Sequence, residues 1–306
     1  MWNAVRFAIG RLDTDVETDA AVDVSSTRFV DQWILARLHA TIAKLEAAVA
    51  SYQFNVYADT LYDFIWRDLC DRYLEAVKPT IDDDPVQQAV LAAVFDASLR
   101  IMAPVCPFIT ETLWPHVTGA RCGEVIGLEL PPSDLLAAAA WPVAAGDVAN
   151  DAVVADFDRA YALITEIRTL RASQNVKPKQ KIALNAPANV LDLISSTGGM
   201  VETLAGLGSV ADDSEGAPAI SSAVAFEGAQ VFLSGLSDEV NVDEERARLE
   251  DVIAQKSKQI GGFQGKLSND GYVNGAPPHL VQETRDMLAA AEADLAAAEA
   301  SLERLA

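Results

Sequence analysis

Two amphipathic stripes between residues 27 and 79 predict a pair of long helices packed antiparallel. In the first stripe, apolar residues recur every three or four positions, which places them on one face of an α-helix. Its members are Ile34, Leu38, Ile42, Leu45 and Val49. After a polar break at 51–53, the second stripe recurs at every fourth residue, as Tyr57, Leu61, Ile65, Leu69 and Tyr73. Pro79 ends the pair, because proline cannot continue a helix without losing a backbone hydrogen bond.

A third, more strongly apolar helix is predicted from Asp84-Pro85, where an N-cap carboxylate precedes a proline at the first helical position. Its apolar positions continue to Met102, and Pro104 marks its end. This helix supplies the partner that the two stripes need, and a shorter helix is predicted over residues 108–114. Together these elements predict a helical bundle spanning residues 1–118.

The next two segments differ in pattern from the bundle. Residues 119–147 contain several glycines and prolines and are interpreted as a linker. Helical and strand patterns then alternate over residues 148–240. The helical patterns lie at 153–172 and 190–209, and the candidate strands at 181–185, 223–226 and 230–233. This alternation predicts a small α/β domain.

Residues 241–306 predict an antiparallel coiled-coil hairpin, because seam positions alternate spacings of four and three in two separate runs. The first run is Leu249, Ile253, Lys256, Ile260, Phe263 and Leu267, and the second is Val281, Thr284, Leu288, Ala291, Leu295, Ala298, Leu302 and Leu305. Turn residues separate the runs. The expected fold class is therefore mainly α, with a helical bundle, a small α/β domain and a C-terminal hairpin.

The net charge of the chain argues against a nucleic-acid partner, but the charge of two local segments does not. The 306 residues carry a formal net charge of −22, whereas phosphate binding relies on lysine and arginine. Two segments nevertheless are basic. The first holds Arg168, Arg171, Lys177, Lys179 and Lys181 with Glu166 as its one acid, and the second holds Arg246, Arg248, Lys256, Lys258 and Lys266 with Glu250 and Asp251. Each is either a phosphate-binding surface or a solvated helix face.

Other sequence features exclude several classes of protein. No apolar run reaches the roughly 18 residues of a membrane span, and the N-terminus lacks the pattern of a secretory signal, so a cytoplasmic protein without a membrane partner is expected. Cys70, Cys106 and Cys122 are widely spaced, which is typical of reduced core thiols and not of a metal site. No metal is therefore expected.

Two sets of motifs, in the bundle and in the hairpin, carry a resemblance to a known family. The bundle motifs are Asp31-Gln32-Trp33-Ile34-Leu35-Ala36-Arg37-Leu38, Phe54, Ala58, Leu61-Tyr62, Phe64, Trp66, Cys70-Asp71, Tyr73-Leu74-Glu75 and Lys78-Pro79. The hairpin motifs are Glu245-x-x-Arg248-Leu249, Lys266-Leu267-Ser268-Asn269, Tyr272-Val273, Ala276-Pro277 and Val281. These motifs resemble those of class I aminoacyl-tRNA synthetases, and among them the valyl-tRNA synthetases. The resemblance covers nearly the whole chain and implies an anticodon-binding bundle followed by a tRNA-binding arm.

The resemblance also implies site residues. Asn3-Ala4-Val5-Arg6-Phe7 is similar to a segment that opens the bundle in that family, so it implies that Phe7 stacks on an anticodon base with Arg6 beside it. Without the resemblance, Phe7 reads as a buried bundle residue. The resemblance extends tRNA contact to the hairpin cations Arg246, Arg248, Lys256, Lys258 and Lys266. The first residues resemble the middle of an apolar helix, so preceding sequence is expected.

The chain departs from the family pattern in lacking the His-x-Gly-His and Lys-Met-Ser-Lys-Ser motifs that hold ATP. No catalytic residue and no cofactor are therefore expected here, and ATP and Mg²⁺ would belong to a catalytic domain supplied in cis or in trans. The resemblance implies that the function is to position tRNA(Val) for valylation by that domain. The alternative is a non-enzymatic helical adaptor whose coiled coil binds a protein.

Overall fold

The computed structural model divides into two compact units, and each is described by itself. The first unit holds residues 1–160 with 196–200, and the second holds residues 161–195 with 201–306. The described residues are 1–12, 22–119, 125, 127–144, 150–213, 218, 221–236 and 242–304. Leu305, Cys122 and parts of the predicted linker (residues 120–124, 126 and 145–147) lie outside them.

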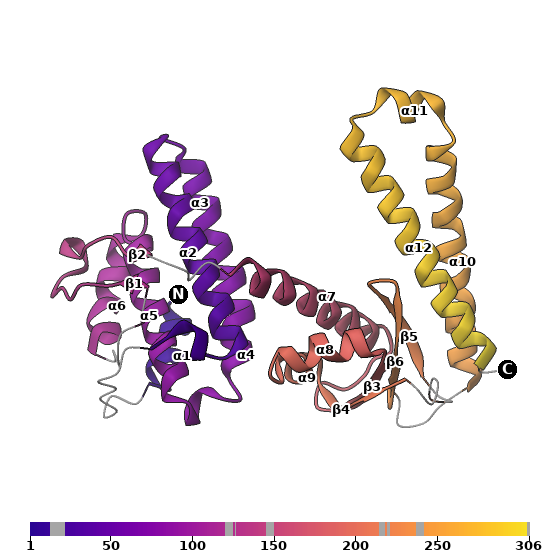
Figure 1. The fold of residues 1–306 in the computed structure, drawn as a ribbon, viewed down its shortest axis with the longest axis horizontal. Helices are drawn as coiled ribbons and strands as arrows, with labels where there is room; N and C mark the ends of the chain where they lie inside the picture. The colour runs from indigo at the N-terminus through magenta and orange to yellow at the C-terminus, as the bar shows by residue number, and fades with distance from the viewer. Residues whose placement is uncertain are drawn as a thin grey trace. The chain divides into compact units, whose positions relative to one another are not determined.

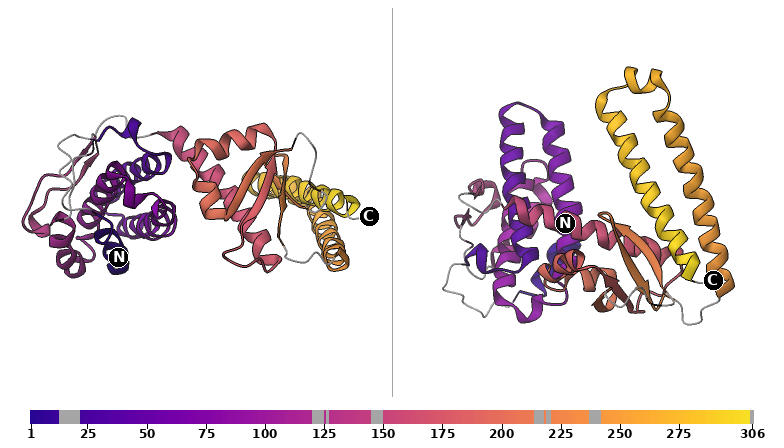
Figure 2. Two further views of the ribbon diagram at one scale, coloured as in Figure 1. Left: turned by 90° about the horizontal axis from the view of Figure 1, so that it is seen from below. Right: turned by 45° about the vertical axis from the view of Figure 1, so that its right-hand side comes forward.

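The first unit is a helical bundle built on the two predicted stripes (Figure 1). Helix α2 (Phe29–Ala50) lies beside α3 (Phe54–Tyr62), as Figures 1 and 2 both show. The second helix then continues through the segments η2 (Asp63–Tyr73) and α4 (Leu74–Val77). A short N-terminal helix, α1 (Trp2–Ile9), packs on the same core.

A π-helical turn explains why the second stripe recurs at every fourth residue. Side chains four apart drift around a helix of 3.6 residues per turn, so a strict spacing of four cannot stay on one face of it. Segment η2 is π-helical, with the wider turn of i→i+5 hydrogen bonding. All five members of the stripe, Tyr57 to Tyr73, are buried, and the last three of them lie in this segment. In the first stripe the expectation fails at Val49, which is 48% exposed near the end of α2.

Helix α5 (Pro85–Met102) is the centre of the bundle, as its apolar pattern predicted. Every residue from Gln87 to Ile101 is buried. The predicted N-cap is present, because the Asp84 carboxylate accepts a hydrogen bond of 3.0 Å from the backbone N–H of Gln87. Helix α6 (Pro107–Gly119) follows and packs on α5 and α1.

A buried ion pair on α5 anchors the segment that follows the bundle helices. Asp96 and Arg100 pair at 2.5 Å with side chains only 2% and 1% exposed. The Arg100 guanidinium also donates to the carbonyls of Pro131 and Ala140, each at 2.8 Å. It thereby holds residues 127–144 against α5. The elements of this part are η1 (Val24–Ser26), η3 (Ile81–Asp83), η4 (Leu136–Ala138) and the antiparallel strands β1 (Leu128–Glu129) and β2 (Val143–Ala144).

Helix α7 (Asp151–Ser173) begins in the first unit and ends in the second. Near its start Phe157 stacks on Trp33 of α2, with ring centroids 3.6 Å apart and planes 8° from parallel. Both side chains are completely buried. The first turns of α7 are therefore part of the bundle core.

The second unit contains a four-stranded mixed sheet in the order β4-β3-β6-β5. Its strands are β3 (Ile182–Ala186), β4 (Leu207–Asp212), β5 (Ser222–Phe226) and β6 (Ala229–Ser234). Strands β3 and β4 are parallel and are connected through α8 (Ala188–Ser196) and α9 (Met200–Ala205), and the other pairs are antiparallel. The helical expectation for 190–209 is wrong from Leu207 onward, because that residue begins β4 and is buried against the sheet.

The chain ends in the expected helical hairpin. Helix α10 (Val242–Leu267) and helix α12 (Pro278–Arg304) run side by side, with α11 (Asp270–Gly275) at the turn (Figure 1). The seam buries Leu249, Ile260, Val281, Ala291 and Ala298, and α12 also packs on β5. A Cβ at Gly261, Gly262 or Gly265 of α10 would meet no atom within 4 Å. The fold is mainly α, as predicted.

Candidate nucleic-acid interface

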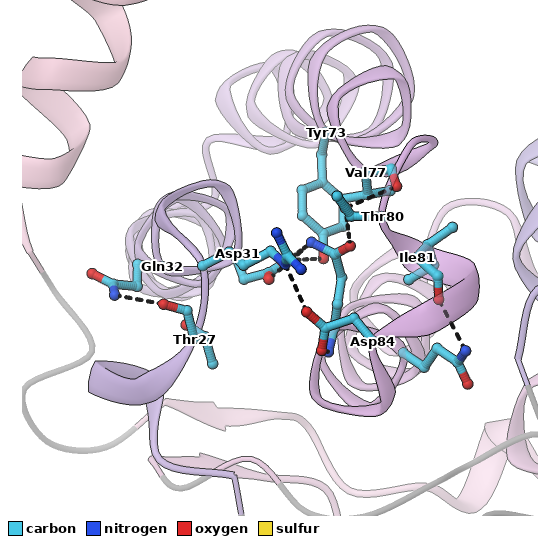
Figure 3. Close-up of polar contacts among 11 residues, drawn as sticks. Thr27, Asp31, Gln32, Tyr73, Val77, Thr80, Ile81 and Asp84 are labelled. Carbon is cyan, nitrogen blue, oxygen red and sulfur yellow. Dashed lines mark hydrogen bonds and ion pairs between the residues drawn. The ribbon is translucent and has the colours of Figure 1, made fainter. Parts of the chain in front are cut away.

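A buried polar network fixes the loop between the second helix and α5 (Figure 3). The Tyr73 hydroxyl donates to Asp31 Oδ1 at 2.7 Å, and Gln87 Nε2 donates to Asp31 Oδ2 at 3.0 Å. Thr80 Oγ1 donates to Gln87 Oε1 at 2.6 Å, and Gln88 Nε2 donates to the Ile81 carbonyl at 2.9 Å. Residues 78–84 are thereby held to α2 and α5.

Asp31 is the buried acid at the centre of this network. Removal from water raises the pKa of its carboxyl from 3.8 to about 7, although hydrogen bonds from Tyr73 and Gln87 act in the opposite direction. The neighbouring Asp84 carboxylate raises this pKa further, and Arg28, which pairs with Asp84 at 2.6 Å, lowers it. The loop is therefore attached through a group that changes charge near neutral pH.

The fixed loop meets helix α1 at the predicted stacking residue. Ala4, Val5 and Ala8 of α1 face the core, which leaves Arg6 exposed and Phe7 half-buried at the rim. The exposure of Phe7 is thus intermediate. It is lower than the resemblance implies for a stacking platform and higher than the alternative interpretation, a buried bundle residue, requires.

Two cations that sequence reasoning missed lie over the Phe7 ring. The Arg11 Cζ is 5.1 Å from the ring centroid and the Lys78 Nζ is 5.9 Å from it, which is within the range of a cation–π contact. Arg11 is held in place by Asp82 of the loop, at 2.7 Å. We call Phe7, Arg11 and Lys78 the aromatic–cation cluster. Lys78 carried a signal, since Lys78-Pro79 belongs to the family motif, but Arg11 carried none.

The hairpin cations follow one another in a row along the length of α10, at several positions around the helix, and do not form a compact cluster. Arg246 and Lys266 are 20 residues apart, which corresponds to about 30 Å along a helix. Arg246, Lys258 and Lys266 are exposed and Arg248 is half-buried. Lys256 differs from the others, because its Nζ pairs with Asp294 of α12 at 2.5 Å and so joins the two helices. Arg6 and Phe7 belong to the first unit and these cations to the second.

The described residues contain no group of three or more side chains suited to holding a metal ion. In the same part of the chain, no helix is both long and apolar enough to cross a membrane. The two candidate surfaces are thus an aromatic ring with nearby cations and a basic helix row, which are the usual elements for contacting bases and phosphates.

Comparison with known families supplies the decisive match. Residues 31–186 match the family described as the anticodon-binding domain of tRNA ligase. The chain belongs to this family. Beyond this anticodon-binding domain, residues 241–306 match the valyl tRNA synthetase tRNA binding arm. The first match thus begins within α2 and ends with β3, and the second covers the hairpin.

Relatives of this chain match along nearly its whole length. Valine-tRNA ligase of Rhodopirellula baltica is 33% identical over 97% of the chain, and that of Thermotoga maritima is 30% identical over 94%. The valine-tRNA ligase of Streptomyces avermitilis is 32% identical over 100% of the chain. The chain spans only 29%, 31% and 33% of these three relatives, respectively. It therefore corresponds to the C-terminal portion of a valyl-tRNA synthetase, as its motifs predicted.

Proposed function

We propose that the chain binds tRNA(Val) and positions it for ATP-dependent valylation by a synthetase catalytic domain. The observation that carries this proposal is the presence, in one chain and in family order, of an anticodon-binding domain and a tRNA-binding arm. ATP and Mg²⁺ would be bound by the catalytic domain, since the chain contains neither of the family's ATP-binding motifs.

The aromatic–cation cluster supports anticodon contact at the bundle. An aromatic ring can stack on any base, and the contact contributes about 1 to 3 kcal/mol. Arg11 and Lys78 lie beside the ring, where they would approach the phosphates that flank such a base, although their pairing with Asp82 and Glu75 offsets part of their charge. Arg6, exposed on the preceding position of α1, would add a further phosphate contact.

The row on α10 supports contact with the sugar-phosphate backbone. Arg246, Lys258 and Lys266 are exposed at different positions around the helix, and those on the side that meets the RNA can contact its phosphates. We assign Lys256 a weaker part, because its pairing with Asp294 already offsets its charge. Arg248 belongs to the same row.

A comparison of two lysines on one helix tests the proposal. Titration of the full chain with a tRNA transcript carrying a valine anticodon, at several salt concentrations, gives the affinity and its salt dependence. Lys258→Gln should lower the logarithmic salt slope by about 0.7 to 0.9, which is the share of one phosphate contact. Lys256→Gln removes the same charge two residues away and should change the slope less. Absence of tRNA binding by the unaltered chain would refute the proposed function.

A protein-binding adaptor is the second candidate, favoured by exposed aromatic side chains on the second helix. Tyr62 and Trp66 are each 59% exposed and stack on each other with centroids 6.3 Å apart. Such a pair is suited to a protein contact. This candidate gains support if the chain fails to bind tRNA but is captured by a synthetase catalytic domain added in trans.

A further inference from the structure

The structure divides the cations of the basic segment at the end of α7 by their contacts. Arg171 is buried, and Arg168 is exposed but its Nε donates to the Leu204 carbonyl at 2.9 Å. Lys177, Lys179 and Lys181 are exposed. The three lysines lie on the connection between α7 and β3, residues 174–181, which we call the lysine loop.

Buried Arg171 fixes the shape of the lysine loop. Its guanidinium donates to the carbonyls of Lys177 at 3.1 Å and Gln180 at 2.9 Å, and more weakly to that of Gly206 at 3.4 Å. Gly206 permits this approach, because a Cβ there would lie 3.3 Å from the guanidinium carbon and the residue has a φ of +71°. A guanidinium with its fork of donors is suited to joining several carbonyls at once.

Two glutamines attach the lysine loop to the sheet. Gln174 Nε2 donates to Ser222 Oγ of β5 at 2.8 Å, and Gln180 Nε2 donates to the Gly235 carbonyl just after β6, also at 2.8 Å. The backbone that carries the lysines is thus fixed by side chains on both sides of them. A binding surface that is already ordered loses little conformational entropy when a ligand arrives.

The charge around the lysine loop is unusual for this chain. Of the 306 residues 45 are acidic, yet none lies between Glu166 and Asp192. Among the described residues, neither Lys179 nor Lys181 forms an ion pair. The α10 row differs, because Glu250 and Asp251 separate its two arginines from its lysines and Lys256 is paired with Asp294. In a protein of net charge −22, such an acid-free segment is where a polyanion meets least repulsion.

We propose that the lysine loop is a further RNA-binding site, which contacts the sugar-phosphate backbone through Lys177, Lys179 and Lys181 on a frame held by Arg171. The proposal rests on the proposed tRNA-binding function and adds to it a third contact surface. Lysine is a point charge without the geometry for reading bases, so the contact positions the RNA and does not distinguish its sequence.

Removal of the three charges tests the site. The variant Lys177→Gln/Lys179→Gln/Lys181→Gln should bind a tRNA transcript at least tenfold more weakly at about 0.1 M salt, and its logarithmic salt slope should fall by about 2. Its thermal unfolding should be unchanged, since the side chains are exposed. The matched control Lys44→Gln/Arg67→Gln/Arg159→Gln removes three charges elsewhere, two of them already paired with Asp63 and Asp156. It should retain the slope.

A charge-conserving variant tests the frame. Arg171→Lys keeps the net charge but cannot reach the three carbonyls together, so tRNA affinity should fall while the triple lysine-to-arginine variant retains it. If the unaltered chain binds tRNA and the triple glutamine variant binds with the same affinity and slope, the inference is refuted and the proposed function stands. If the unaltered chain binds no tRNA, both are refuted.

Discussion

Phe7 illustrates how burial and binding can be separated at a single residue. Its ring is half-buried at the rim of the bundle and lies under two cations, while the neighbours Val5 and Ala8 are in the core. A residue in this position contributes to stability through one part of its surface and keeps another part accessible. Stability and affinity are therefore separate measurements on one variant.

We expect Phe7→Ala to weaken binding of tRNA with a valine anticodon by about 1 to 3 kcal/mol, the contribution of one stacked base. The loss of unfolding free energy should stay below the roughly 3 to 5 kcal/mol of a fully buried phenylalanine. Trp2→Ala is the control, because it removes a 52% exposed aromatic from the same helix. A large loss of stability with unchanged affinity would contradict the stacking role.

Asp31 makes the stability of the bundle depend on pH. Its pKa in the folded protein, about 7, lies above its unfolded value near 3.8, so the folded state binds the proton more tightly. The associated stability is fully present below about pH 4 and is lost as the pH rises through about 7. The total change is at most about 4 kcal/mol, since each pKa unit corresponds to about 1.4 kcal/mol.

Urea unfolding between pH 5 and pH 8 measures this effect. The free energy of unfolding should fall toward the alkaline end in the unaltered chain, and the fall should be smaller in Asp31→Asn, which cannot ionise. Equal pH dependence in the two proteins would show that other groups control it. The amide oxygen introduced by Asp31→Asn can still accept the hydrogen bond from Tyr73, and the Gln87 amide could rotate to meet the new amide donor.

At the scale of elements, a helix or strand was predicted correctly where the sequence signal for it lies within the element itself. Asp84-Pro85 predicted the start of α5 correctly, because a cap and a proline act within one turn. The π-helical segment was not predicted. The spacing of four in the second stripe indicated it, but that spacing was interpreted as α-helical. Strand β4 was missed because its residues, from Leu207, form a strand only through pairing with β3. The pairing of Lys256 with Asp294 likewise depends on the hairpin's register.

The ion pair on α5 yields a prediction for an element. Arg100→Met should cost about 3 to 5 kcal/mol, because it leaves the Asp96 carboxylate buried without its cation. Asp96→Leu/Arg100→Met should recover part of this loss, but not the bonds that Arg100 makes to the carbonyls of Pro131 and Ala140. Denaturant midpoints of the single and double variants provide the comparison. Equal midpoints would mean that the carbonyl contacts, and not the ion pair, carry the stability.

For the molecule as a whole, our proposal places tRNA binding on this chain and catalysis on a separate domain. Three surfaces on this chain are proposed to contact tRNA, and the ATP-binding motifs of the family are not among its residues. We therefore expect no valine-dependent pyrophosphate exchange from this chain alone, in protein prepared free of host synthetase. Exchange above background would contradict this expectation. A catalytically competent synthetase assayed with the same valine and ATP is the positive control.

The three glycines of α10 have a consequence for how fast the arm opens. Gly261, Gly262 and Gly265 face open space, so packing requires none of them, and each weakens the helix by about 0.5 to 1 kcal/mol relative to alanine. Gly261→Ala/Gly265→Ala should slow amide hydrogen exchange along α10 without altering charge or seam. Gly206→Ala should instead speed amide hydrogen exchange around residue 206, because that residue has a positive φ and a Cβ there would crowd the Arg171 guanidinium. The rate at which the hairpin opens locally can thus be changed without changing its charge. Comparing the rate of tRNA release from the glycine and alanine variants would show whether the rigidity of the arm affects that rate.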